Sequence, residues 1–445
     1  MKNILLIGAG RSATALIGYL LENAAKHAWN VTVADSDPAL AQQKVGNHPN
    51  GRAVWLDVTK QNDRRELIGR HDVVISLLPV FLHMDVAQDC ILLKKHLVTA
   101  SYVSKEMYGL ADQVRQHNLI FMGEMGLDPG IDHMSAVQKI NEIKEKGGKI
   151  TAFRSYTGGL VAPESDDNPW NYKISWNPRN VVLAGQGTAQ YMENSKHKYI
   201  PYNRLFTSYD IVEIQNFGAL EMYPNRDSLL YREAYGIENT PNIIRGTLRH
   251  RGFCDAWNAL RKIGLTDNSY PIVDSDSMTF HELMEAFVWK KTAGTLRERI
   301  ANLVGISSDS GVIKKMEWLG LFSKKKIPIA KASPAMILEH LMVEKMTLKE
   351  HDKDMVIMQH EFEYKVGRSL RKLTSTMILK GEDAHNTAMA KTVGLPVGIF
   401  VKLLMEGKMD IKGVNIPTIK EIYEPVLEEL KSYGIYFTEK DEVIA

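Results

Sequence analysis

The amino-terminal segment up to Asp37 constrains the fold more than any other part of this chain. An apolar run at residues 4–7 leads into the turn Gly8-Ala9-Gly10-Arg11-Ser12-Ala13, and a second apolar run ends on Asp35. Gly8 permits a tight turn, and Gly10 lets backbone N–H groups approach a pyrophosphate at the start of a helix. The pattern therefore predicts a strand, a turn, a helix and a second strand that together bind a dinucleotide.

Three side chains of this segment refine the prediction. Ala13 occupies the third small position, where the helix must pack closely on the strand. Asp35 is placed to accept hydrogen bonds from a ribose 2′-hydroxyl, which suits NAD and repels the extra phosphate of NADP. Arg11 either contacts phosphate or lies in solvent. The alternative is that the glycines form only a tight turn in another doubly wound domain.

Composition limits the classes of protein to consider. A length of 445 residues predicts two or three domains. The chain has 55 Lys and Arg against 53 Asp and Glu, so no basic face is implied and we expect no nucleic-acid partner.

Cysteine content and hydropathy predict a cytoplasmic protein. The two cysteines, Cys90 and Cys254, are far apart in sequence, so neither a disulfide framework nor structural zinc is expected. The amino terminus reads as a strand and not as a signal peptide. No apolar run reaches the roughly twenty residues that span a bilayer, so we expect no membrane segment.

Alternating strand and helix patterns predict an α/β fold with a parallel sheet. After the first two strands, short apolar runs recur at residues 53–56, 73–77, 96–99 and 119–122. Ligand contacts are expected just beyond the carboxyl ends of such strands. Those ends carry Asp57-Val58, Leu77-Leu78-Pro79, Ala100-Ser101-Tyr102 and Gly126-Leu127-Asp128-Pro129-Gly130.

The pattern changes from about residue 149. Strands are expected at 150–156 and 209–215, separated by a long irregular polar loop. A helical region follows at about 252–349. Residues 356–364 and 371–379 alternate like a hairpin, and helices are expected at 388–405 and 419–433.

Asp128 has two interpretations. The following proline keeps it out of helical geometry, so its carboxylate either binds a cationic amine or water, or caps the helix that opens at Gly130. Asp132 and His133 are assigned to the first turns of that helix. Because no Cys/His cluster accompanies them, no metal is expected.

Arg226 and Arg249 are the candidate carboxylate-binding residues. A guanidinium is always charged and binds a carboxylate through two parallel hydrogen bonds. Either arginine could instead pair with a neighbouring acid such as Asp227. The aromatic and polar loop at 168–179 either covers a nicotinamide or forms a domain interface.

These segments together resemble the saccharopine dehydrogenase family, of the glutamate-forming type also called saccharopine reductase. The resemblance covers nearly the whole chain, in segments 8–13, 56–59, 76–79, 101–102, 126–133, 156–163, 168–179, 224–228, 245–249 and 318–322. It implies a Rossmann-type parallel-sheet domain at 1–125 with about 385–445, a mixed α/β substrate domain at 126–250 with about 350–384, and a helical insertion at 251–349.

The resemblance also implies a reaction and its residues. Saccharopine joins lysine and glutamate through a secondary amine, and its reversible oxidation and hydrolysis give glutamate and α-aminoadipate semialdehyde, in lysine metabolism. Cofactor contacts are implied at Gly8, Gly10, Arg11, Ser12, Ala13, Asp35, Ser36, Asp57, Val58, Leu78, Ala100, Ser101, Leu127, Asp128, Pro129 and Asn177. Substrate contacts are implied at Ser101, Tyr102, Asp128, Arg226, Thr247, Leu248 and Arg249.

Tyr102 and Asp128 are the predicted catalytic residues. No general base is evident, and the family leaves room for the substrate's own amine to move protons, so we expect these two residues mainly to position and polarise. Fungal relatives that use NADP carry an arginine near the tip of the second strand, where this chain has Asp35-Ser36-Asp37. NAD is therefore the expected cofactor.

The sequence leaves two alternative functions open and predicts one oligomeric state. The enzyme could be a carboxynorspermidine-type or opine-type dehydrogenase, or the chain could bind nucleotide without turnover. The presence of Tyr102, Asp128, Arg226 and Arg249 argues against a non-catalytic relative. A homodimer is the expected assembly.

Overall fold

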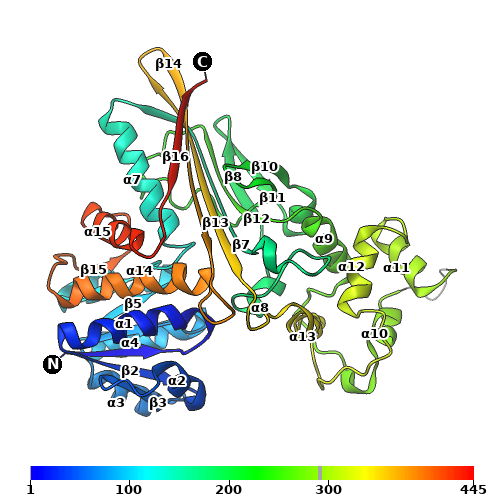
Figure 1. Cartoon of the computed structure of the whole chain (residues 1–445), viewed down its shortest axis with the longest axis horizontal. Coiled ribbons are helices and arrows are strands. Elements are labelled where there is room, and N and C mark those ends of the chain that lie inside the picture. Colours follow the sequence, from blue (N-terminus) through cyan, green and yellow to red (C-terminus); the bar gives the residue numbers. More distant parts are fainter. Residues whose placement is uncertain (1, 289–292, 445) are drawn as a thin grey trace. The chain divides into compact units, whose positions relative to one another are not determined.

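The chain folds into two compact units (Figure 1). This computed structural model describes residues 2–288 and 293–444. Unit 1 comprises Met1–Lys149 and Met377–Thr438, and unit 2 comprises Ile150–Thr376 and Glu439–Ala445. Residues 126–149, which the resemblance assigned to the substrate domain, lie in unit 1 because α7 (Ile131–Glu145) packs against α15 (Lys420–Lys431).

Unit 1 is built on a seven-stranded sheet in the order β15-β6-β5-β4-β1-β2-β3, and its strands pair in parallel. Its inner strands are apolar and buried because helices cover both faces. The predicted Rossmann-type sheet is confirmed. The strands are β1 (Lys2–Ile7), β2 (Trp29–Asp35), β3 (Gly51–Trp55), β4 (Val73–Ser76), β5 (His96–Thr99), β6 (Ile120–Met122) and β15 (Gly413–Asn415).

The helices of unit 1 include α1 (Thr14–His27) and α14 (Ala388–Met405), which lie side by side (Figure 1). A Cβ at Gly394 would lie 2.8 Å from the backbone nitrogen of Leu16, so glycine permits this close packing. By length and composition alone α14 could cross a membrane, but 78% of it is buried inside the structure, as in a core helix. The other helices are α2 (Pro38–Val45), α3 (Gln61–Gly69), α4 (His83–Leu92), α5 (Lys105–Tyr108) and α6 (Ala111–Gln116).

Unit 2 contains a nine-stranded mixed sheet, as expected. Its main path runs β10-β11-β12-β7-β13-β14-β16, with β7 and β12 parallel and β10, β11 and β12 antiparallel in turn. The predicted hairpin is confirmed in β13 and β14. The strands are β7 (Lys149–Val161), β8 (Ala189–Glu193), β9 (Lys196–Ile200), β10 (Asp210–Ile214), β11 (Gly218–Pro224), β12 (Asn242–Arg249), β13 (Asp354–Val366), β14 (Ser369–Lys380) and β16 (Thr438–Val443).

The long irregular loop expected between the first two strands of unit 2 was a wrong prediction. That region contains α8 (Pro178–Val182) and the hairpin of β8 and β9. β8 also pairs with β12, so backbone groups that a loop would leave exposed are hydrogen-bonded within the sheet.

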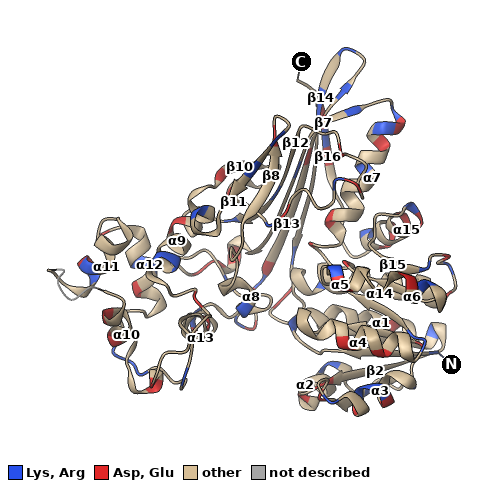
Figure 2. Cartoon of the chain, turned by 180° about the vertical axis from the view of Figure 1, so that it is seen from behind, with Lys and Arg blue, Asp and Glu red and all other residues tan. Residues whose placement is uncertain are grey.

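The helical region of unit 2 shares one core with residues 170–206. Trp257 of α9 (Phe253–Ile263) packs in this core with Trp170 and Phe206. Positive and negative side chains are interspersed over both units (Figure 2). The remaining helices are α10 (Phe280–Ala286), α11 (Leu296–Val304), α12 (Gly311–Leu319) and α13 (Pro334–Met346).

Candidate active site

The glycine turn of unit 1 has the geometry of a pyrophosphate cradle. Gly8 has a φ of +105°, and a Cβ there would lie 2.8 Å from the carbonyl oxygen of Leu77, so only glycine fits. A Cβ at Gly10 would meet no protein atom within 4 Å, which leaves open space above the turn. Gly10 precedes the short helix Arg11–Ala13, which has no side-chain cap, and Ala13 is buried. The turn therefore fits a dinucleotide phosphate.

Asp35 is connected directly to this turn. Its Oδ2 accepts a hydrogen bond from the Ala9 N–H at 2.6 Å, and its Oδ1 accepts one from the Asp37 N–H at 2.9 Å. Lys44 Nζ donates to the Gly10 carbonyl at 2.6 Å, and burial lowers the pKa of Lys44 to about 8. Asp37 caps α2. The Asp35 carboxylate is thus hydrogen-bonded to the glycine turn. Ser36, the next residue, is exposed.

A buried ion pair supports the loop that follows β3. The Val58 carbonyl accepts a hydrogen bond from Arg64 Nη1 at 2.6 Å, and Arg64 Nε donates to Asp89 Oδ2 at 2.7 Å. Asp57 accepts hydrogen bonds from the hydroxyl and N–H of Thr59, and these bonds lower the pKa of Asp57. Arg64 and Asp89 were not predicted from the sequence, because neither belongs to a recognisable motif.

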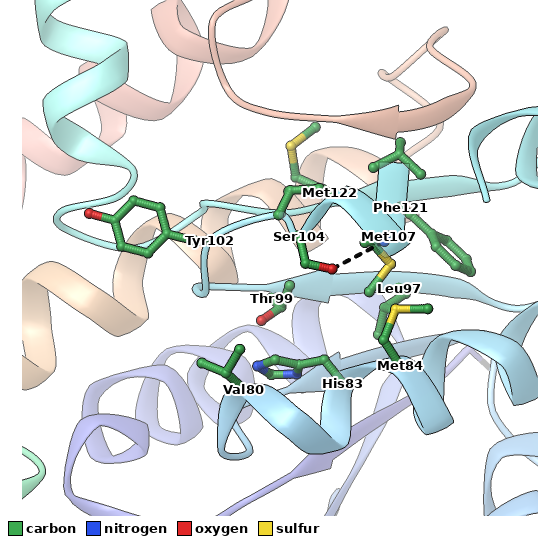
Figure 3. Close-up of a pocket in the computed structure, with 13 residues that line it drawn as sticks. Val80, His83, Met84, Leu97, Thr99, Tyr102, Ser104, Met107, Phe121 and Met122 are labelled. Carbon is green, nitrogen blue, oxygen red and sulfur yellow. Dashed lines mark hydrogen bonds between the residues drawn. The ribbon is translucent and has the colours of Figure 1, made fainter. Parts of the chain in front are cut away.

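Three polar side chains form a hydrogen-bonded chain at the ends of β4 and β5. His83 Nδ1 lies 2.9 Å from Ser76 Oγ, and His83 Nε2 lies 2.8 Å from Ser101 Oγ. Burial lowers the pKa of His83 to about 4, so its ring is neutral near neutral pH. Figure 3 shows His83 among the residues that line a pocket of unit 1, together with Thr99 and Tyr102. The predicted contacts Leu78 and Ala100 lie half-buried at the same strand ends.

The two predicted catalytic residues touch each other. Tyr102 donates a hydrogen bond from its hydroxyl to Asp128 Oδ1 at 3.0 Å. The interpretation of Asp128 as a helix cap was wrong, because α7 begins after Gly130 without a side-chain cap, and the Gly130 N–H is bound by Asp132 at 2.6 Å. Leu127 and Pro129 are buried in the same loop, beside the half-buried Asp128.

The buried side chains of Glu124 and His133 lie next to the segments that carry Tyr102 and Asp128. Glu124 Oε1 accepts a hydrogen bond from the Val103 N–H at 3.0 Å, and its Oε2 lies 2.8 Å from Nε2 of His133. His133 lies in the first turn of α7, as predicted. The Glu124 side chain therefore connects the segment after Tyr102 to the helix after Asp128.

Arg249 of unit 2 has the character of a carboxylate receptor. It ends β12, is 4% exposed, and its guanidinium lies 5.4 Å from the ring of Tyr172 and 5.2 Å from that of Phe253. Nη1 donates to the Leu248 carbonyl, whereas Nε has no hydrogen-bond partner. Within residues 2–288 and 293–444, no carboxylate forms an ion pair with Arg249. The unpartnered Nε–H fits an incoming carboxylate.

The other predicted contacts of unit 2 differ in exposure. Thr247 is half-buried and, by strand alternation, shares a face of β12 with Arg249, whereas the Leu248 side chain points to the other face. Arg226 is exposed in the turn after β11. The Asn177 side chain caps α8 by accepting from the Arg179 N–H at 3.0 Å.

In the described part of the chain, no three His, Cys, Asp or Glu side chains are grouped so as to hold a metal ion. Cys90 and Cys254 are free and buried.

Comparisons with known proteins decide the family. The sequence profile of the saccharopine dehydrogenase NADP binding domain matches residues 4–122, and that of the saccharopine dehydrogenase C-terminal domain matches residues 126–435. The chain belongs to the saccharopine dehydrogenase family. The resemblance stated from the sequence is thereby confirmed.

Individual relatives agree with this assignment. The chain is 35% identical to saccharopine dehydrogenase [NADP(+), L-glutamate-forming] of Saccharomyces cerevisiae, over 99% of each chain. The solved apo structure of saccharopine dehydrogenase (L-Glu forming) from that yeast covers 99% of this chain with a TM-score of 0.88. The chain is also 34% identical to the mitochondrial alpha-aminoadipic semialdehyde synthase of Bos taurus, but it spans only 48% of that relative's length.

A more distant structure shows the fold alone. The homospermidine synthase of Legionella pneumophila, solved with NAD, is 11% identical and has a TM-score of 0.54.

Proposed function

We propose that this chain oxidises saccharopine, with a nicotinamide cofactor and water, to glutamate and α-aminoadipate semialdehyde, reversibly. The observation that carries the proposal is Arg249, a buried guanidinium with no carboxylate partner in the described part of the chain. A buried charge is costly unless it is paired, and a substrate carboxylate would supply the partner. The names of the fungal relatives support the same substrate.

The chemistry assigns roles to residues of unit 1. The C–H bond on the lysine-side carbon next to the secondary amine breaks, and its electron pair leaves as hydride for the nicotinamide. The resulting C=N bond then takes up water, and the C–N bond breaks to release glutamate and the aldehyde. Asp128, held by Tyr102, would stabilise positive charge on the nitrogen and orient the water. We propose positioning and polarisation as their main roles.

NAD is the cofactor that we propose. Asp35 at the end of β2 supports it, because a carboxylate there accepts ribose hydroxyls and repels a 2′-phosphate. The names of the fungal relatives and the description of the matching nucleotide-binding profile point instead to NADP. Lys44, beside Gly10, would offset part of the repulsion.

One assay tests the proposal. Purified protein is given saccharopine, an opine or carboxynorspermidine, each with NAD and with NADP at equal concentration, while absorbance of the reduced cofactor is followed. We expect reduction with saccharopine, faster with NAD, and equimolar glutamate. Faster turnover of another conjugate would replace the substrate, and cofactor binding without any reduction would indicate a non-catalytic relative.

A further inference from the structure

The chain of hydrogen bonds through His83 has a buried end and a ligand-side end. Ser76 ends β4 and is fully buried, and His83 is the first residue of α4 with 4% of its surface exposed. Ser101 follows β5 and is only half-buried. It stands where parallel α/β sheets bind their ligands. The imidazole therefore joins the protein interior to a predicted ligand contact.

The neutral imidazole fixes what the Ser101 hydroxyl can do. One ring nitrogen donates a hydrogen bond and the other accepts one, while each serine hydroxyl can do both. In one tautomer Ser101 accepts from His83 and keeps its own proton for a ligand. In the other it donates to His83 and offers the ligand only lone pairs. In both cases the hydroxyl is held in one orientation.

The backbone of Ser101 is already fixed by other bonds. Its N–H donates to Thr99 Oγ1 at 3.1 Å, and its carbonyl accepts from the Glu124 N–H at 3.0 Å. The remaining freedom is rotation of the side chain between staggered positions. The bond to His83 removes that freedom before a ligand arrives, and such preorganisation lowers the cost of binding.

We propose that His83 is a positioning residue that sets the orientation and hydrogen-bond polarity of the Ser101 hydroxyl toward bound cofactor and substrate. The inference rests on the proposed function for the identity of the ligands. The coupling between His83 and Ser101 is measurable by cofactor binding alone.

His71 is a matched control for a merely structural histidine. It is buried in the same unit, its Nε2 lies 2.9 Å from the Thr32 hydroxyl, and its Nδ1 lies 2.7 Å from the Leu67 carbonyl. Burial lowers its pKa as well. Thr32 lies within β2 and is no predicted ligand contact, so we expect loss of His71 to affect stability alone.

The experiment compares His83→Asn, His83→Gln, Ser101→Ala, the double variant His83→Asn/Ser101→Ala, and His71→Asn. Asparagine places its amide near the former Nδ1, toward Ser76, whereas glutamine reaches the former Nε2, toward Ser101. For each protein we would measure the melting temperature, the Kd for NADH by fluorescence, and kcat and KM for saccharopine.

We expect His83→Asn to lower kcat/KM and to weaken NADH binding. The two losses multiplied together should be about tenfold, the size of one lost hydrogen bond. His83→Gln should recover most of the loss. In the Ser101→Ala background, His83→Asn should change neither quantity further, because the group through which it acts is gone. His71→Asn should lower only the melting temperature.

Two results would overturn the proposal: effects of His83→Asn and Ser101→Ala that multiply in the double variant, or an equal loss of kcat/KM in His71→Asn. If His83→Asn fails to fold, Ser76→Ala replaces it, and its smaller effect should likewise vanish in the Ser101→Ala background. If the wild-type protein binds NADH but does not oxidise saccharopine, the proposed function fails, while the NADH constants still decide the role of His83.

Discussion

The hydroxyl of Tyr102 donates a hydrogen bond to Oδ1 of Asp128 across 3.0 Å. The two residues come from different strand ends, since Tyr102 follows β5 and Asp128 follows β6. Their neighbours are connected as well, because Glu124 binds the Val103 N–H and lies against His133 of α7. Side-chain contacts therefore link the loops after β5 and β6 to each other and to α7.

Tyr102→Phe removes this bond without removing the ring. If Tyr102 positions Asp128, kcat should fall about tenfold, which is the worth of one hydrogen bond to a charged group. Asp128→Asn should lower kcat further but leave measurable turnover. Loss of all turnover in Asp128→Asn with unchanged saccharopine affinity would show instead that Asp128 is an essential acid or base.

Arg249→Met removes the proposed carboxylate receptor. We expect KM for saccharopine to rise about a hundredfold, because truncating one partner of a buried charge pair costs several kcal/mol. Arg154→Met is the control, since Arg154 lies on β7 of the same sheet and already pairs with Glu363 at 2.7 Å. An equal rise in KM in both variants would argue against a specific role for Arg249.

Asp35→Asn tests the choice of cofactor. Removing the charge should lower the ratio of kcat/KM for NAD to that for NADP by about tenfold, because the 2′-phosphate is no longer repelled. Asp37→Asn removes a neighbouring charge while keeping a side chain that caps helices equally well. An unchanged ratio in Asp35→Asn, or an equal change in Asp37→Asn, would contradict the role of Asp35.

The lowered pKa of His83 should make the stability of the protein depend on pH. Its pKa falls from 6.5 to about 4 on folding because the ring is buried. Above 6.5 the ring is neutral in both states, and below 6.5 only the unfolded chain binds the proton, so stability falls as pH falls. As the pH falls from 6.5 to 4, the free energy of unfolding should fall more steeply in the wild type than in His83→Gln. The difference between the two slopes should be about 1.4 kcal/mol per pH unit. Urea titrations at several pH values measure both slopes, and parallel slopes would refute the prediction.

Asp89→Asn tests the buried support of the loop after β3. Asp89 is 1% exposed and pairs with Arg64 and Arg65, so its loss leaves the buried Arg64 guanidinium with only the exposed Asp85 carboxylate, at 3.8 Å. The free energy of unfolding should fall by about 3–5 kcal/mol. The exposed pair of Arg70 and Glu66 provides the control, and Glu66→Gln should cost less than about 1 kcal/mol. Denaturant unfolding measures both, and equal losses would contradict the prediction.

Local sequence patterns predicted the glycine turn and the parallel sheet. The positions of Gly8, Gly10 and Asp35 follow from short-range rules of turn and strand geometry. The prediction of a loop at residues 157–208 was wrong. β8 and β9 form a hairpin there, and in the sequence alone polar residues at a sheet edge resemble a loop.

The sequence by itself determined which strands end in polar residues and which residue types stand there. Only the tertiary structure decided which of them meet. Tyr102 donates a hydrogen bond to Asp128, which does not cap α7, and His83 is hydrogen-bonded to Ser101. Both contacts form because β4, β5 and β6 are neighbours in the sheet, so that their carboxyl ends lie together. The burial of the Arg249 guanidinium likewise depends on packing against Tyr172, which is distant in sequence, as well as against the nearby Phe253. Backbone geometry is set over a few residues, whereas side-chain partners depend on the packing of the whole unit.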